Sequence, residues 1–277
     1  MSNKNKKDKC PQLQIEPVEI DESLLNEVEH GIWIFPSVHA VIGKIASGKS
    51  TFLHNIMEKF WSPIFDTNII LFSPTARNDP IMNELIENEK IFCHFEEYSN
   101  HLMAGILDII KEDQPTKYLI IFDDCMGQLP RTGSREAKFW NKYYCNFRHE
   151  PTEGQVSLVF SIQKFSSLNN VMRANLHYIY LLGKSSENEL KFLSNEMNAI
   201  SGGSTEKFLE LYEKSKNEPY SFMTLDFKKL RVLKNLDTLL FDGMDSVDYS
   251  DTNQSLECND DDKDNKDDKD NKDKKIK

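Results

Sequence analysis

Residues 38–51 read Val-His-Ala-Val-Ile-Gly-Lys-Ile-Ala-Ser-Gly-Lys-Ser-Thr. The run from Val38 to Ile42 is typical of a short buried strand, and the next eight residues match the pattern G-x-x-x-x-G-K-[ST] at every fixed position. Residues 51–60 follow with apolar side chains at helical spacing and without Gly or Pro. Strand, glycine loop and helix in this order are the context in which the pattern binds nucleotide phosphates. The sequence therefore predicts a phosphate-binding loop, the Walker A motif.

The residue types of this loop suit a triphosphate, which carries several negative charges on crowded oxygens. Gly43 and Gly48 let the backbone wrap closely, so that its N–H groups and the positive end of the following helix face the phosphates. Lys49 supplies a mobile cation, and the Ser50 hydroxyl is a predicted ligand of Mg²⁺. The predicted nucleotide-binding residues are Gly43, Lys44, Ile45, Ala46, Ser47, Gly48, Lys49, Ser50 and Thr51.

A second motif lies in residues 117–124, where four consecutive apolar residues lead into two carboxylates. This is the form of a Walker B strand, which lies inside a parallel sheet with its end at the ligand crevice. Asp123 is predicted to hold Mg²⁺, directly or through water. Asp124 is predicted to orient and deprotonate the attacking water. A buried strand that simply leaves the core at a solvated acidic turn is the alternative interpretation.

Strand-like and helix-like segments alternate from residue 38 to residue 182, which predicts an α/β fold with a mostly parallel sheet and helices on both faces. The strand at 156–161 leads to Gln163, a polar residue placed to contact the γ-phosphate or the attacking water. Residues 220–227 alternate like an edge strand. A helix at 135–147 carries an aromatic stripe, which we interpret as core packing rather than a base-stacking surface.

The composition bounds the domain organisation of the 277-residue chain. We expect an N-terminal arm at 1–29, one P-loop ATPase domain at 30–245, and a disordered Asp/Lys/Asn-rich tail at 246–277. The net charge is −11, so a global basic footprint for nucleic acid is missing. Five cysteines without a C-x-x-C pair favour a reducing compartment without disulfides or a zinc site. Neither a membrane-spanning run nor a signal-peptide core is present in the sequence.

Several motifs in a fixed order resemble the genome-packaging ATPases of nucleocytoplasmic large DNA viruses, virophages and related mobile elements, in the FtsK–HerA branch of P-loop motors. The resemblance spans residues 35–230. The matching residues are the phosphate loop Gly43 to Ser50, Ser73-Pro74-Thr75, Leu119 to Asp124, Arg148-His149, Ser161-Ile162-Gln163 and Arg173-Ala174-Asn175. The chain departs from many cellular relatives in carrying Asp123-Asp124 where they have Asp-Glu.

The resemblance implies an ATP- and Mg²⁺-dependent motor that forms a homo-oligomeric ring and drives viral double-stranded DNA into a capsid. Capsid or portal-vertex proteins would be further partners, and the host cytoplasm and the virion would be its locations. The resemblance also implies an arginine finger that acts on the neighbouring subunit. Arg148 holds the matching position, with Arg173 as the second choice.

The residues that would contact DNA are less clear from the sequence. Arg131 and Arg135 could face a central pore, and the basic segment 228–234 could line an outer surface, or either could be an ordinary charged face. Two other functions stay open: a P-loop small-molecule kinase, and a nucleotide-binding assembly switch without motor activity. A guanine-specifying Asn-Lys-x-Asp occurs only within the low-complexity tail, so we discount a GTPase.

Overall fold

A computed structural model of the chain describes residues 26–27, 33–113, 116–129, 134, 137–146, 156–196 and 204–243. Its strands are β1 (Asn26–Glu27), β2 (Ile34–Phe35), β3 (Val38–Ile42), β4 (Ile69–Phe72), β5 (Cys93–Phe95), β6 (Tyr118–Asp123), β7 (Val156–Ile162), β8 (Tyr178–Leu181), β9 (Met223–Asp226), β10 (Arg231–Lys234) and β11 (Thr238–Asp242). Its α-helices are α1 (Lys49–Ile56), α2 (Ser62–Phe65), α3 (Pro80–Glu87), α4 (Asn100–Glu112), α5 (Ala137–Asn146), α6 (Asn170–Ala174), α7 (Glu187–Glu196) and α8 (Thr205–Ser215). None of the helices in these ranges has both the length and the apolar character needed to cross a membrane.

Nine strands form one sheet in the order β11-β10-β9-β8-β3-β7-β6-β4-β5. The six strands from β8 to β5 are parallel, and β9, β10 and β11 extend the sheet with antiparallel pairings. The predicted mostly parallel sheet is thereby confirmed. A single strand, β7, lies between β3, which leads into the phosphate loop, and β6, which ends at Asp123.

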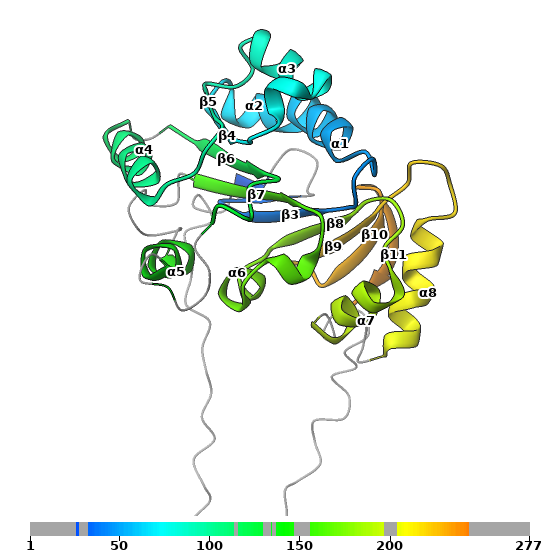
Figure 1. Cartoon of the computed structure of the whole chain (residues 1–277). Helices are drawn as coiled ribbons and strands as arrows, with labels where there is room; N and C mark the ends of the chain where they lie inside the picture. Colours follow the sequence, from blue (N-terminus) through cyan, green and yellow to red (C-terminus); the bar gives the residue numbers. More distant parts are fainter. Residues whose placement is uncertain are drawn as a thin grey trace, which may run out of the picture. The chain divides into compact units, whose positions relative to one another are not determined.

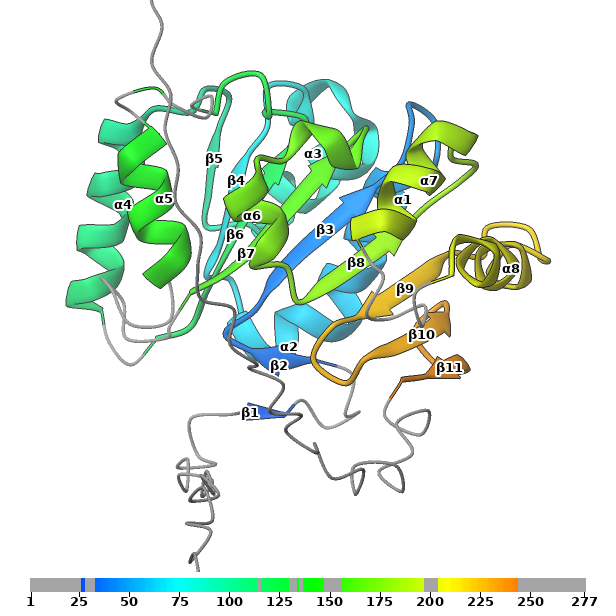
Figure 2. The same ribbon diagram turned by 90° about the horizontal axis from the view of Figure 1, so that it is seen from below.

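Helices cover both faces of this sheet (Figure 1). One core lies beneath α1, α2 and α3, and a second lies against α4 to α8, with α4 and α5 side by side in Figure 2. Strand β6 shows why both faces must be covered. Tyr118, Ile120 and Phe122 enter the second core, whereas Leu119 and Ile121 enter the first, as the two-residue repeat of a strand dictates. A strand that is buried on both faces therefore has a continuous run of apolar residues in its sequence.

A ladder of four phenylalanines crosses four adjacent strands just below the polar edge of the sheet. Phe95, Phe72, Phe122 and Phe160 stack in that order, with successive ring centroids 5.3, 5.2 and 5.1 Å apart. Stacked rings of this kind fill the space between neighbouring parallel strands with apolar surface. The next residues on three of these strands, Ser73, Asp123 and Ser161, therefore lie side by side at the carboxyl ends of β4, β6 and β7.

The structure corrects one prediction about the C-terminal part of the sheet. The predicted edge strand at 220–227 corresponds to β9, which lies inside the sheet between β8 and β10. Its residues are all buried, because β10 and β11 continue the sheet beyond it. The prediction for the aromatic helix is confirmed: Trp140, Tyr143 and Tyr144 of α5 are buried in the second core.

Strand β3 also carries a fully buried histidine, His39, within a hydrogen-bonded chain. Trp33 Nε1 donates to the Tyr180 hydroxyl at 2.6 Å, and that hydroxyl lies 3.0 Å from His39 Nδ1. His39 Nε2 lies 2.7 Å from Ser37 Oγ. Burial lowers the pKa of His39 from 6.5 to about 3, so the ring is neutral in the folded chain.

We expect this histidine to make the fold sensitive to acid. Below pH 6.5 the unfolded chain protonates His39 and the folded chain does not, so stability is lost as the pH falls from 6.5 towards 3. The contribution of one such group has a limiting slope of about 1.4 kcal/mol per pH unit. His39→Gln keeps hydrogen-bonding groups but cannot titrate. Denaturant unfolding between pH 7.5 and 4.5 should show a shallower decline for His39→Gln, and equal slopes would contradict this account.

Candidate functional site

The phosphate loop connects the end of β3 to the start of α1. Gly48 adopts a φ of 89° and Ala46 a φ of 60°, left-handed values that turn the chain back into the helix. A Cβ atom on Gly43 would lie 2.2 Å from Ser47 Oγ and 3.0 Å from Ser47 Cβ, so any side chain there would displace Ser47. No side chain caps α1. Its first amide groups therefore face outward in the arrangement that binds phosphate oxygens.

Lys49 and Ser50 lie at the first turn of α1, where the motif requires them. Lys49 Nζ donates to the carbonyl of Gly43 at 2.9 Å and approaches that of Lys44 at 3.4 Å, so the ammonium lies across the loop. Ser50 Oγ donates to Asp79 Oδ2 at 2.5 Å. Asp79 comes from the far end of a different loop, and the sequence motifs give no sign of this contact.

Asp123 ends β6 and is almost fully buried, with 9% of its surface exposed. Ser73 Oγ donates to Asp123 Oδ2 at 3.1 Å. Burial raises the pKa of Asp123, while the Ser73 hydrogen bond and the positive charge of Lys49 act in the opposite direction. The strand that ends at Asp123, β6, is separated by one strand from β3, which leads into the loop that carries Lys49.

Asp124 and Gln163 form a pair on neighbouring strand ends. Gln163 Nε2 lies 3.1 Å from Asp124 Oδ1 and 3.3 Å from Oδ2, and the Asp124 amide donates to the carbonyl of Ser161 at 3.1 Å. Asp124 adopts a φ of 51°, which is uncommon for a residue with a side chain. Both side chains are exposed. The carboxylate is thus held by an amide and open to solvent water.

Of the two arginines predicted as a finger, Arg148 and Arg173, the structure describes Arg173. Arg173 donates to the carbonyl of Leu168 at 2.7 Å, to Asn170 Oδ1 at 2.6 Å and to Glu196 Oε2 at 3.4 Å. Each of its nitrogens thus has a partner in its own chain, and its guanidinium also lies 5.2 Å from the centre of the Phe192 ring. Arg148 lies outside the described residues.

The donors present fit a magnesium ion held together with a nucleotide. Ser50 offers a hydroxyl and Asp123 a carboxylate, which are the oxygen ligands that Mg²⁺ prefers. Across the part of the chain that the structure describes, no three His, Cys, Asp or Glu side chains gather into a metal cage. Two oxygen ligands suit Mg²⁺, which is commonly bound by one or two carboxylates together with substrate phosphates and water.

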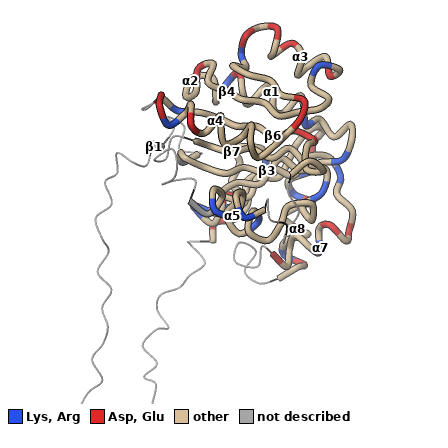
Figure 3. Tube along the Cα trace, turned by 60° about the vertical axis from the view of Figure 1, so that its left-hand side comes forward, with Lys and Arg blue, Asp and Glu red and all other residues tan. Residues whose placement is uncertain are grey.

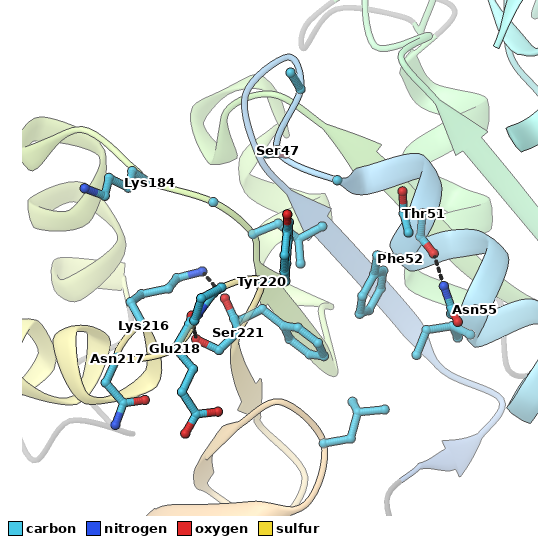
Figure 4. A pocket seen from close by; sticks show the side chains of 18 of the residues that line it. Ser47, Thr51, Phe52, Asn55, Lys184, Lys216, Asn217, Glu218, Tyr220 and Ser221 are labelled. Carbon is cyan, nitrogen blue, oxygen red and sulfur yellow. Dashed lines mark hydrogen bonds between the residues drawn. The ribbon is translucent and has the colours of Figure 1, made fainter. Parts of the chain in front are cut away.

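A cavity of about 820 Å³ opens beside the phosphate loop (Figure 4). Ser47 and Thr51 lie on one side of it, and Tyr220 and Ser221 of the segment between α8 and β9 lie on the other. Its lining residues are Ala46, Ser47, Gly48, Thr51, Phe52, Asn55, Ile56, Lys59, Phe60, Leu182, Gly183, Lys184, Lys216, Asn217, Glu218, Pro219, Tyr220, Ser221, Phe222 and Leu236. Four of the nine predicted binding residues line it, namely Ala46, Ser47, Gly48 and Thr51. The other five, Gly43, Lys44, Ile45, Lys49 and Ser50, do not, and Ile45 is 79% exposed.

Sequence reasoning missed the far wall of this cavity. Lys216 Nζ donates to the carbonyls of Leu181 at 2.6 Å and Ser221 at 3.2 Å, and burial lowers the pKa of this lysine to about 8. These bonds tie the end of β8 to the segment that carries Tyr220. Lys216, Tyr220 and Ser221 lie more than 160 positions from the phosphate loop, so no local spacing could have linked them to it.

The basic segment 228–234 offers fewer free charges than its sequence suggests. Arg231 pairs with Asp226 at 3.0 Å, and Lys234 pairs with Glu218 at 2.5 Å. Figure 3 shows acidic and basic residues interspersed along the visible helices and loops. Arg131 and Arg135, the other predicted DNA contacts, lie outside the described residues.

No family model matches the chain, and no curated protein matches its sequence. Solved structures do share its fold. One is the DNA-packaging ATPase B204 from Sulfolobus Turreted Icosahedral Virus, with a TM-score of 0.53 and 15% identity over 72% of this chain and 96% of that chain. Another is the genome packaging NTPase B204 from Sulfolobus turreted icosahedral virus 2 in complex with ATP-gammaS, with a TM-score of 0.51, 13% identity and the same coverage of both chains. The predicted resemblance to genome-packaging ATPases is confirmed at the level of the fold.

Proposed function

We propose that this chain is an ATP-hydrolysing motor that moves viral double-stranded DNA into a capsid. The observation that carries the proposal is the meeting of three groups at one edge of the sheet. Lys49 follows the loop at the end of β3, Asp123 ends β6, and the Asp124–Gln163 pair joins the end of β6 to that of β7, the strand between β3 and β6. A cation for phosphates, a metal ligand and a candidate base are the parts that phosphoryl transfer from ATP to water requires.

The proposed reaction assigns a role to each of these side chains. The oxygen of water bonds to the γ-phosphorus while the bond from that phosphorus to the β–γ bridging oxygen breaks, giving ADP and phosphate. Asp124 takes the proton of the water, and Gln163 holds the carboxylate in place. Lys49 offsets the negative charge of the outer phosphates. Ser50 and Asp123 would hold Mg²⁺, which when bound neutralises charge on the β- and γ-oxygens.

The cavity beside the loop is our candidate site for the adenine and ribose. Its volume of about 820 Å³ falls within the range of about 300–1,000 Å³ common for small-molecule sites. Phe52 and Tyr220 offer aromatic rings from α1 and from the segment before β9, respectively. Flat aromatic surfaces of this kind stack on nucleobases. The solved B204 structure with ATP-gammaS supports a nucleotide at this fold.

We further propose that the motor is a homo-oligomeric ring that works with capsid or portal-vertex proteins in the host cytoplasm and the virion. Arg148 is the preferred arginine finger, because the donors of Arg173 are engaged within its own chain. An arginine finger supplied by a neighbouring subunit stabilises the transition state and raises the rate of hydrolysis by about 10³–10⁵-fold. A ring would also concentrate small basic patches in its channel, which reconciles DNA binding with an acidic chain.

Steady-state hydrolysis with and without double-stranded DNA tests this function. We expect the purified chain to hydrolyse ATP in the presence of Mg²⁺ and to do so faster when duplex DNA is added. GTP should be a poorer substrate if the cavity selects adenine. An inactive chain, or one whose ATP consumption rises only with a small-molecule phosphoryl acceptor and not with DNA, would contradict a packaging motor.

A further inference from the structure

The segment between β4 and α3, residues 73–79, contacts both predicted metal ligands. At its start, Ser73 Oγ donates to Asp123 Oδ2 at 3.1 Å. At its end, Asp79 Oδ2 accepts the hydroxyl proton of Ser50 at 2.5 Å. This segment follows β4, which is three strands away from β3 in the sheet. It nevertheless reaches the first turn of α1 and the end of β6.

Both ends of this segment are themselves fixed. The Ser73 amide donates to the carbonyl of Phe95 at 2.9 Å, and His94 Nε2 lies 2.9 Å from the Ser73 carbonyl. Asp79 caps α3, because its Oδ1 accepts from the amides of Ile81 at 2.9 Å and Met82 at 3.3 Å. Between them Ala76 is fully buried in the core beneath α1 to α3. The two contacts are therefore made by anchored side chains.

The chemistry of a hydroxyl gives the Asp79 contact a consequence. A serine has one proton and two acceptor lone pairs. When Asp79 accepts the hydrogen bond from Ser50, it sets the rotation of the hydroxyl and leaves both lone pairs free for a cation. Ser73 acts on Asp123 in a complementary way, since its hydroxyl donates to Oδ2 and so orients the carboxylate. Outer groups that orient metal ligands in this manner change metal affinity or activity by about 10–100-fold when they are lost.

We propose that residues 73–79 position both ligands of the Mg²⁺ that accompanies the nucleotide, with Asp79 orienting Ser50 and Ser73 orienting Asp123. The inference rests on the proposed function, because it concerns the metal of the same site. Asp79 and Ser73 are positioning residues that act through Ser50 and Asp123. The ligand class is a divalent cation bound together with a nucleoside phosphate.

Asp79→Asn is the sharpest single variant. Asparagine caps helices as well as aspartate does, so its oxygen can still accept from Ile81, while its amide nitrogen cannot accept the Ser50 proton. Glu84→Gln is the matched control, because it removes one exposed carboxylate from the same helix. Ser73→Ala tests the other contact without touching the cap of α3. Thermal unfolding of each variant reports whether the fold is kept.

The measurement is the affinity for ADP by calorimetry, in Mg²⁺ and in EDTA, with Mn²⁺ binding to the ADP complex followed by electron paramagnetic resonance. We expect Asp79→Asn and Ser73→Ala to weaken Mn²⁺ binding by about 10-fold or more. Both should also weaken ADP binding in Mg²⁺, with the affinity in EDTA and the Glu84→Gln control unchanged. In a Ser50→Ala background, Asp79→Asn should have no further effect on Mn²⁺ binding, because the hydroxyl that it orients is gone.

Three results would overturn the inference. Unchanged Mn²⁺ affinity in Asp79→Asn and Ser73→Ala would remove the positioning role while leaving the proposed function in place. Equal losses of ADP affinity in Mg²⁺ and in EDTA would show general damage to the pocket instead of an effect on the metal. A wild-type chain that binds no ADP under either condition would remove the proposed function, and this inference with it.

Discussion

Replacing Lys49 with alanine is expected to lower ATP turnover by about 10²–10³-fold or more, the loss seen when one preorganised group that stabilises transition-state charge is removed. The ammonium lies across the phosphate loop on the carbonyls of Gly43 and Lys44, where the outer phosphates of a bound nucleotide would meet it. Alanine removes this positive charge, so the outer phosphates lose the cation that offsets their negative charge. Initial rates of phosphate release over a range of ATP concentrations measure the effect.

Lys111→Ala is a suitable control for the Lys49 variant. Lys111 is exposed in the last turn of α4, which packs on the opposite face of the sheet from α1. Removing it changes the net charge by the same amount and should leave turnover unchanged. Hydrolysis by Lys49→Ala at the wild-type rate would mean that the phosphate loop is not the site of the chemistry.

Asp124→Asn is expected to bind ATP with Mg²⁺ as the wild type does and to hydrolyse it about 10²–10⁴-fold more slowly, the usual contribution of a general base. An amide has the shape of the carboxylate and can still accept the Gln163 hydrogen bond, but it cannot take a proton from water. Single-turnover hydrolysis and equilibrium binding of ATP, measured on the same preparation, separate the two effects.

Asp108→Asn provides the matched carboxylate for this second experiment. Asp108 is exposed on α4, so its neutralisation should alter neither binding nor turnover. If Asp124→Asn instead loses metal-dependent binding of ATP as strongly as it loses turnover, Asp124 would be a metal-positioning residue. The role of base would then have to lie elsewhere.

The fold was largely predictable because its central strands are buried on both faces. Such strands appear as short apolar runs, and those at 38–42 and 117–124 match β3 and β6 closely. Strand β9 was assigned to an edge because alternation alone cannot show what pairs with a strand. Strand β10 was not predicted, because it begins and ends with a charged residue, Arg231 and Lys234. Both can lie in the sheet because they form ion pairs with Asp226 and Glu218.

The candidate site was predictable only where its chemistry is local. The phosphate loop places Lys49 and Ser50 by spacing alone, and the acidic end of an apolar run gives Asp123 and Asp124. Ser73 was noted only as part of a motif and Asp79 was not predicted as a site residue, because their contacts with Asp123 and Ser50 span 50 and 29 residues of sequence. Contacts of this kind depend on the order and register of the strands, and the spacing of residues within a sequence motif does not reveal either.

A structure of the chain with ATP-gammaS and Mg²⁺ is the most direct test of the central claim, that one pocket holds the phosphates, the metal and the base. We predict the γ-phosphate between Lys49 and the Asp124–Gln163 pair, the metal at Ser50 and Asp123, and the adenine in the cavity lined by Phe52 and Tyr220. A nucleotide bound away from Lys49, or a γ-phosphate out of reach of a water held by Asp124, would contradict it.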